Sequence, residues 1–293
     1  MQQKISLVLS GGGARGIAHI GVIHVLQEKG FEIQAIAGTS MGALVGGVYA
    51  GGGLNAFTQW LVNADIKEAV KMLDFSIKLP GVIKADKIMH KIDGFLSIKQ
   101  IEDLPIPYTA IATDINALEK VSFEQGNLIE AIRASIAIPS VFTPVFKDKQ
   151  ILVDGGLINN LPINHISNNK YPIIAVCVNA DTRLSIEEKQ IMDNKSELAH
   201  LAKLQKIRVQ LQQYLNKKSN KEKHHIGYAE LLDKSIHLMI GRASQHIIDH
   251  NPPDLLINIS REICGTLDFL KAEKIIEIGR LAAIDALNKF DFI

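Results

Sequence analysis

The sequence predicts an α/β fold of three layers, in which helices cover both faces of a mainly parallel central sheet. Strand-like and helix-like segments alternate through the first half of the chain, which is the pattern of successive strand–helix units. Residues 173–178 form a continuous apolar run, as expected for a strand that is covered on both faces. No linker separates two cores, so we expect a single domain over residues 1–293, with a mainly helical C-terminal part from about residue 184.

Apolar runs bounded by turn residues mark the expected strands, and helical periodicity marks the segments between them. We expect strands at 5–9, 33–37, 109–113, 151–153 and 173–178, and helices at 14–29, 41–50 and 268–287. Gly30 follows the first helix as a stop signal. The basic stretch 198–225 carries leucines at helical spacing. Such a helix either makes peripheral contact with an anionic membrane or forms a solvated surface or homodimer contact, and we favour the second reading.

The composition is that of an ordinary globular protein, with 47% hydrophobic and 22% charged residues. A formal net charge of +1 argues against a nucleic-acid partner, because dedicated nucleic-acid binders usually carry a strongly basic domain. Two cysteines indicate neither a disulfide framework nor a zinc site, and they fit a reducing compartment. The apolar run at 5–9 is too short for a signal peptide. We therefore expect a cytoplasmic protein with no metal site.

Residues 33–64 contain no Asp, Glu, Lys or Arg, which raises the question of a membrane span. A spanning helix needs about 20 mainly apolar residues. Glycines and polar side chains interrupt this stretch repeatedly, so we interpret it as a buried strand followed by buried helix of small residues.

The sharpest local signal is the G-x-S-x-G sequence Gly38-Thr39-Ser40-Met41-Gly42, placed between an expected strand and an expected helix. A nucleophilic serine must protrude from a tight turn, and glycines on either side remove the Cβ atoms that would clash there. The helix that follows directs its N–H groups towards the hydroxyl. The alternative is a glycine-rich turn that only lets strand and helix pack closely.

A glycine-rich loop, residues 10–16 (SGGGARG), follows the first strand and opens the first helix. Its backbone N–H groups would form a site for a phosphate or for the oxyanion of an acyl intermediate. Gly11, Gly13 and Gly16 also fit the dinucleotide pattern G-x-G-x-x-G. That pattern expects an acidic residue after the second strand, where this chain has 37–40 (AGTS), so we expect no cofactor.

The third signal is Asp154-Gly155-Gly156, directly after the expected strand at 151–153. A carboxylate in that turn could take the proton of Ser40 as a general base, although an Asp-Gly turn is common for structural reasons alone. All three loops follow apolar strands, and in a parallel sheet they would share one carboxyl edge. A nucleophile, an oxyanion cradle and a base would meet there, as acyl transfer requires.

An α/β-hydrolase with a Ser–Asp–His triad is the obvious competitor. Its fold places several strands before the nucleophile, whereas here one strand–helix unit precedes Ser40. The histidines that could complete a triad lie in polar or helical settings without an active-site signature. The triad is therefore the weaker interpretation.

These blocks resemble the patatin-like phospholipase family, and the residues occur in the family's order. The matching blocks are Gly11 to Gly16, Gly38 to Gly42, Asp154 to Gly156, and the segment 134–139 (ASIAIP) with Phe142 and Pro144. The likeness covers about residues 4–180. A weaker C-terminal likeness, at 267–269 and 275–279, is to small bacterial members related to neuropathy target esterase.

The resemblance implies a patatin-like fold and a serine acyl hydrolase that cleaves lipid acyl esters with a Ser–Asp dyad and no metal. Ser40 would be the nucleophile and Asp154 the base. The backbone of Gly11, Gly12 and Gly13 would line the oxyanion hole, and Arg15 would steady that loop. Gly16, Gly38, Gly42, Gly155 and Gly156 would support the motifs. A general short-chain carboxylesterase and a non-catalytic phosphate- or nucleotide-binding module remain the alternatives.

Overall fold

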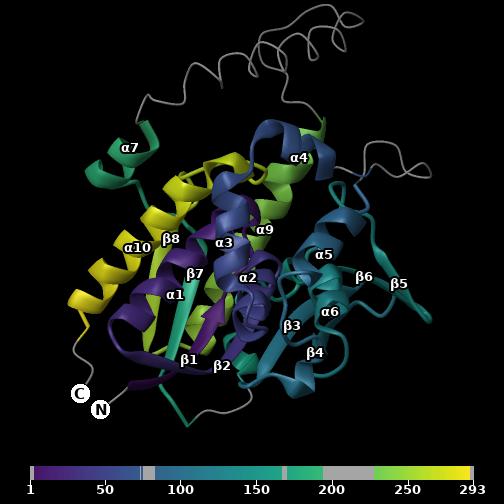
Figure 1. Ribbon diagram of the computed structural model, residues 1–293, viewed down its shortest axis with the longest axis horizontal. Coiled ribbons are helices and arrows are strands. Elements are labelled where there is room, and N and C mark those ends of the chain that lie inside the picture. Colours follow the sequence, from purple (N-terminus) through teal and green to yellow (C-terminus); the bar gives the residue numbers. More distant parts are fainter. Residues whose placement is uncertain (1–2, 73, 75–82, 167–169, 194–227, 291–293) are drawn as a thin grey trace, which may run out of the picture.

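Eight strands form one mixed sheet in the part of the chain that the computed structural model describes, which is residues 3–72, 74, 83–166, 170–193 and 228–290. The basic stretch 198–225 lies outside these residues. The sheet order is β5-β6-β3-β2-β1-β7-β8, with β4 paired to β3 (Figure 1). The three-layer α/β fold expected from the sequence is thereby confirmed.

The sheet has a parallel half and an antiparallel half that meet at β3. The parallel strands are β1 (Gln3–Leu9), β2 (Phe31–Thr39), β3 (Tyr108–Asp114), β7 (Ile173–Ala180) and β8 (Leu255–Ser260). The antiparallel strands are β4 (Glu119–Phe123), β5 (Val145–Lys147) and β6 (Gln150–Asp154). All five strands predicted from apolar runs are present. β4, β5 and β8 were missed, and β4 and β5 are short, partly charged segments without an apolar run.

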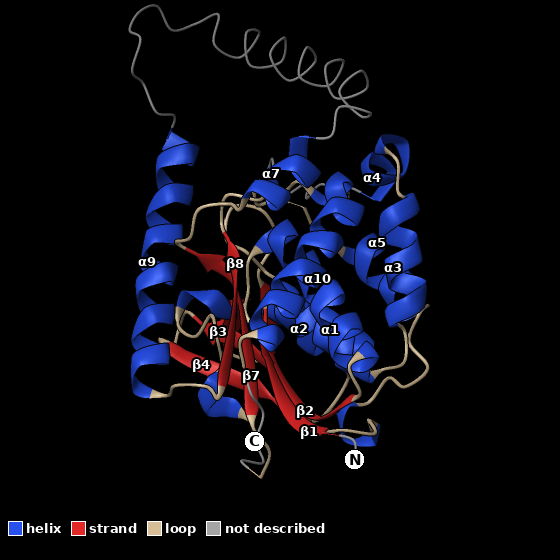
Figure 2. Cartoon of the chain, turned by 90° about the vertical axis from the view of Figure 1, so that its left-hand side faces the viewer, coloured by secondary structure: helices blue, strands red, loops and turns tan. Residues whose placement is uncertain are grey.

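Helices cover both faces of the sheet (Figure 2). Helix α9 (Tyr228–His250) lies on one face, and α1 (Ala18–Glu28), α2 (Met41–Ala50), α3 (Leu54–Asn63) and α10 (Ala272–Asn288) lie on the other. The remaining described α-helices are α4 (Ile66–Met72), α5 (Asp86–Asp93), α6 (Leu128–Ser135) and α7 (Ile186–Asp193). The uncharged stretch 33–64 forms part of β2 and then the buried small-residue helix α2, as expected. It ends in a second helix, α3, whose buried residues are Leu54, Phe57 and Leu61. No described helix is both long and apolar enough to cross a membrane.

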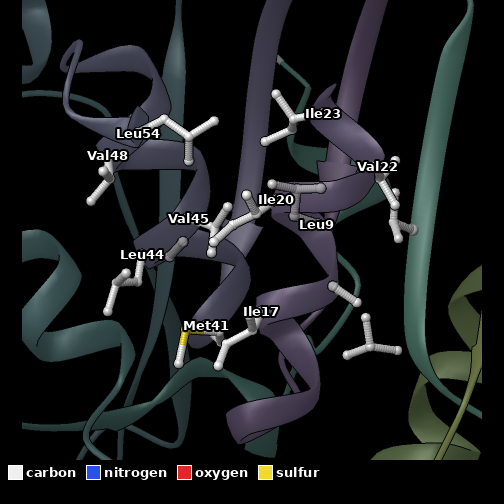
Figure 3. Close-up of a cluster of buried hydrophobic side chains, with 14 of the residues drawn as sticks. Leu9, Ile17, Ile20, Val22, Ile23, Met41, Leu44, Val45, Val48 and Leu54 are labelled. Atoms are coloured by element: carbon white, nitrogen blue, oxygen red, sulfur yellow. The ribbon is translucent and has the colours of Figure 1, made fainter. Parts of the chain in front are cut away.

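Strand β1 distributes its side chains between two cores because successive residues point to opposite faces. Leu7 and Leu9 belong to the large core under α1, α2 and α10, whereas Val8 belongs to a smaller core beneath α9. In the large core, Ile17 and Ile20 lie against Met41 and Val45 of α2 (Figure 3). The first two helices are therefore fixed to each other directly above β1.

The crossing of α1 and α10 depends on two glycines that bring the helix backbones together. A Cβ on Gly279 would lie 2.0 Å from the Ala18 carbonyl oxygen, and a Cβ on Gly21 would lie 2.0 Å from the Ile276 carbonyl oxygen. At the same crossing, both guanidinium ends of Arg280 donate to the Glu28 carboxylate, at 2.7 and 2.8 Å. The C-terminal helix is thus held against the first helix by close backbone contact.

Gly279→Ala should lower the free energy of unfolding by about 1–3 kcal/mol, because the new methyl group cannot fit without separating the helices. Gly241→Ala in α9 is the matched control, since nothing lies within 4 Å of the added Cβ. Alanine is the better helix former, so this control should stabilise the protein by about 0.5–1 kcal/mol. Urea denaturation of both variants measures the difference. Equal stability of the two variants would contradict the close crossing.

Candidate active site

Ser40 occupies a strained turn between β2 and α2. Its backbone angles are φ 54° and ψ −123°, in a region that non-glycine residues rarely adopt. Holding a residue there costs on the order of 1–3 kcal/mol and requires support from its surroundings. The turn also packs tightly against β1, because a Cβ on Gly42 would lie 2.2 Å from the Leu9 carbonyl oxygen. Ser40 thus lies in a tight, strained turn between a strand and a helix, and the residue is buried.

Hydrogen bonds fix the backbone on both sides of this turn. The Ser40 N–H donates to Ser135 Oγ at 2.8 Å, and the Ser135 hydroxyl donates to the Ile111 carbonyl oxygen at 2.6 Å. Thr39 Oγ1 donates to the Asn159 carbonyl oxygen at 2.8 Å. The strained residue is therefore tied to α6, to β3 and to the segment that follows Asp154.

Asp154 reaches Ser40 by a different route from the one that we expected. The expectation of a shared carboxyl edge of parallel strands is wrong for this residue, because β6 runs antiparallel to β3. β4 occupies one edge of β3 over residues 110–114, so β2 and β6 must share the other edge. Ile111 pairs with Thr39 and the next residue, Ala112, pairs with Asp154. The carboxyl ends of β2 and β6 therefore meet end to end.

The Asp154 carboxyl group is buried, and only 6% of the residue is exposed. Burial raises its pKa to about 6, while the Ser40 hydroxyl and the Gly156 N–H act in the opposite direction. Oδ1 accepts the Gly156 N–H at 2.7 Å. Oδ2 has no partner with regular hydrogen-bond geometry among the described residues, so the Ser40 interaction is a loose one. Catalytic hydrogen bonds are often loose before substrate binds.

The glycine-rich loop lies directly beside Ser40. A Cβ on Gly11 would lie 3.0 Å from Ser40 Cβ, so only glycine allows this approach. The Gly11 N–H already donates to the Asn160 carbonyl oxygen at 3.1 Å. Within the described part of the chain, the amides of Gly12 and Gly13 donate to no other protein group. Gly11 thus lines the site through its backbone, while the next two residues hold the unpaired donors.

Arg15 is almost fully buried and connects the loop to two other segments. Its Nε donates to Asn179 Oδ1 at 3.1 Å, and its Nη1 donates to the Cys264 carbonyl oxygen at 3.3 Å. Asn179 in turn donates through Nδ2 to the Gly11 carbonyl oxygen at 2.6 Å. Arg15 thus ties the glycine-rich loop to β7 and to the segment that follows β8. The remaining motif glycines also lie in close contacts: a Cβ on Gly16 would meet Met41, one on Gly38 would meet Gly42, one on Gly155 would meet Ile111 of β3, and one on Gly156 would meet Asn160.

Sequence reasoning assigned no role to several polar residues that hold the site. His19 is fully buried, and its Nε2 lies 2.8 Å from the Ser10 carbonyl oxygen. A carbonyl oxygen only accepts, so Nε2 carries the proton, and burial lowers the pKa of this imidazole to about 4. A neutral histidine therefore anchors the residue before the glycines. The available signal was a histidine among the apolar residues 18–26, a stretch that also contains His24.

Asn160 was also missed, although it joins three elements. Besides accepting the Gly11 N–H, its side-chain Nδ2 donates to Ser244 Oγ of α9 at 3.3 Å and approaches the Gly11 carbonyl oxygen at 3.5 Å. Asn160 thus connects the glycine-rich loop to the turn after Asp154 and to the helix on the second face.

The competing triad finds no support in the described residues, where no histidine forms a hydrogen bond with Ser40 or Asp154. The same residues contain no cluster of three His, Cys, Asp or Glu side chains that could hold a metal ion.

The family of the chain follows from comparison with known proteins. The family model described as patatin-like phospholipase matches residues 7–166, which is more than half of the chain and includes all three loops. The chain belongs to the patatin-like phospholipase family. Membership places it among lipid acyl hydrolases at the general level.

Relatives extend this likeness beyond the matched segment. An NTE family protein of Mycobacterium tuberculosis is 33% identical, in an alignment that covers 98% of this patatin-like chain and 92% of the relative. The patatin-like phospholipase domain-containing protein 7 of Rattus norvegicus is 37% identical over 54% of this chain and 12% of its own length. Among solved structures, VipD from Legionella pneumophila gives a TM-score of 0.46 at 15% identity, over 98% of this chain and 67% of VipD.

Asp154→Asn should stabilise this patatin-like protein at neutral pH. The folded state keeps the Asp154 proton up to about pH 6, whereas the unfolded chain releases it near 3.8. The unfolded state therefore gains its charge first, and the free energy of unfolding falls as the pH rises from about 4 to about 6. Asparagine does not titrate, so the variant does not lose stability in this way. The free energy of unfolding of Asp154→Asn, relative to that of the wild type, should therefore increase by about 3 kcal/mol between pH 4 and pH 7.

Urea denaturation of both proteins across this pH range measures the change in the free energy of unfolding. The contribution of His19 titration cancels in the difference between them, because both proteins contain this residue. Asp114→Asn is the control of opposite sign. Burial would raise the pKa of Asp114, but the N–H groups of Asn116, Ile151 and Ala117 outweigh it and hold this pKa below its usual value. Its replacement should therefore become more harmful as the pH rises. A pH-independent difference between Asp154→Asn and wild type would contradict the raised pKa.

Proposed function

We propose that this protein hydrolyses carboxylic ester bonds of phospholipids, lysophospholipids or related lipids, with Ser40 as nucleophile and Asp154 as general base. The observation that carries the proposal is the end-to-end meeting of β2 and β6, which brings Ser40 to the buried Asp154 carboxyl group. Burial also raises the pKa of this carboxyl group to about 6. A base with a pKa near the working pH is ionised yet still accepts a proton readily. Family membership supports the lipid ester as the substrate class.

The acylation step uses each of the three loops. Asp154 accepts the proton of Ser40 while Oγ attacks the ester carbonyl carbon. The carbonyl oxygen becomes an oxyanion, for which the unpaired amides of Gly12 and Gly13 are the available donors. One donor of this kind is worth about 10²–10³ in rate. The alcohol portion of the lipid then leaves with the proton from Asp154, and the acyl group stays on Oγ.

Deacylation reverses these roles with water. Asp154 takes a proton from the water molecule that attacks the acyl carbon, the same amides hold the second oxyanion, and Ser40 Oγ leaves as the fatty acid is released. Ser40 recovers its proton from Asp154. Because one carboxylate serves both steps, this scheme requires neither a histidine nor a metal.

Ser40→Ala should abolish ester hydrolysis and labelling by a fluorophosphonate probe, which reacts with activated serines. Asp154→Asn should lower kcat by about 10²–10⁴-fold, the usual worth of a general base. Ser6→Ala is the matched control, since Ser6 is buried in β1 and its hydroxyl has no partner among the described residues. Turnover is followed with phosphatidylcholine, lysophosphatidylcholine and p-nitrophenyl butyrate.

The substrate panel separates the alternatives. Hydrolysis confined to the butyrate ester would identify a general short-chain carboxylesterase. Absence of both labelling and turnover in the folded protein, together with stabilisation by nucleotide or phosphate, would favour a binding module and contradict the proposal.

The acid limb of the activity profile should fall near pH 6. Asp154 must be ionised to act as the base, and its pKa of about 6 makes kcat/KM rise with pH through that value. Initial rates on a soluble ester between pH 4 and pH 8 measure the limb. A midpoint near pH 4 would indicate a carboxylate without the raised pKa and would argue against Asp154 as the base.

A further inference from the structure

One short segment at the end of α6 holds the backbones of both Ser40 and Asp154. Ser135 Oγ accepts the Ser40 N–H at 2.8 Å, and two residues later the Ala137 carbonyl oxygen accepts the Asp154 N–H at 3.0 Å. Ser40 and Asp154 come from different strands, which are also related through β3 and through the hydrogen bond from Thr39 to Asn159. Residues 135–137 add a connection that contacts the backbones of Ser40 and Asp154 themselves.

The Ser135 hydroxyl has one available orientation in this arrangement. It has a single proton, which is donated to the Ile111 carbonyl oxygen at 2.6 Å. Its lone pairs remain for the Ser40 N–H, which therefore has a defined acceptor. Ser135 is completely buried, so no solvent molecule competes for either bond. The two hydrogen bonds fix the residue with the strained backbone to β3.

Ile111 gives this connection its geometric consequence. It pairs with Thr39, the residue before Ser40, and its carbonyl oxygen would lie 2.2 Å from a Cβ on Gly155, the residue after Asp154. The acceptor of the Ser135 proton is thus in contact with the Asp154 turn. A shift of Ser135 would move Ser40 relative to that turn.

We infer that Ser135 is a positioning residue, which sets the distance between Ser40 Oγ and the Asp154 carboxylate by holding the Ser40 N–H against β3. The inference rests on the proposed function of these two residues. Removing the hydroxyl leaves the buried Ser40 N–H and Ile111 carbonyl without a partner and frees the strained turn to relax. Ser40 Oγ would then move away from Asp154.

Ser135→Ala should lower kcat by about 10–100-fold with KM changed less than twofold, because a displacement of about 1 Å can cost as much as 10² in rate. The acid limb should also move to higher pH. The Ser40 hydroxyl lowers the pKa of Asp154, and burial and the Gly156 N–H are the other causes of its shift, with no charged side chain involved. A role limited to stability would not move this limb.

Two further variants separate positioning from folding. Ser135→Thr keeps the hydroxyl and should restore most of kcat and the original acid limb. Ser135→Cys keeps the side-chain shape with a weak hydrogen-bonding group, so it should fold and still lose kcat. If Ser135→Ala fails to fold, the kcat and acid limb of Ser135→Cys test the positioning role instead. Ser6→Ala again serves as the buried-serine control and should behave as wild type.

The outcomes distinguish this inference from the function on which it rests. If the wild-type protein shows neither esterase activity nor labelling of Ser40, both the proposed function and the positioning role are contradicted. An active wild type whose Ser135→Ala and Ser135→Cys variants keep kcat and the acid limb within experimental error overturns the positioning role alone. The positioning role is supported if the wild type is active, if Ser135→Ala and Ser135→Cys lower kcat and move the acid limb to higher pH, and if Ser135→Thr reverses both changes.

Discussion

The pairing of β3 with two strands along one edge is the constraint on which the site depends. β2 occupies that edge as far as Ile111, and β6 takes over at Ala112 from the opposite direction. Backbone hydrogen bonds thereby bring the carboxyl ends of two strands together without any side chain being involved. Ser40 and Asp154 are the residues at this junction, so the sheet brings them together, and the hydrogen bonds of Ser135 hold the Ser40 backbone in place there.

The contacts around the junction impose a thermodynamic cost that the rest of the fold offsets. Ser40 is held in an unfavourable backbone conformation, and Asp154 is buried with no cationic partner among the residues that the structure describes. Such features persist only in a rigid environment. Here the environment consists of the packed cores on both faces of β1 and of close backbone contacts such as the α1–α10 crossing. Stability elsewhere therefore allows a reactive arrangement at the strand ends.

Much of the fold could be predicted from the sequence, because long apolar runs produced β1, β2 and β7 and the G-x-S-x-G turn fell where a strand meets a helix. The direction of β6 could not, since a short apolar run is the same in a parallel and an antiparallel strand. The roles of Ser135, Asn160 and His19 were equally hidden. These residues act through hydrogen bonds to groups in other parts of the fold, and such bonds leave no periodic signal in the chain.

The end-to-end meeting of β2 and β6 also separates the chemistry from the stretch between α2 and β3. The described residues between 51 and 107, which include α3, α4 and α5, lead away from the sheet after the Ser40 turn and α2, and the chain returns to the sheet at β3. Loop-closure entropy rises slowly with length, so insertions or deletions in such an excursion need not disturb the strand pairing. Evolution could therefore reshape this region while Ser40 and Asp154 stay at the strand ends where the sheet brings them together.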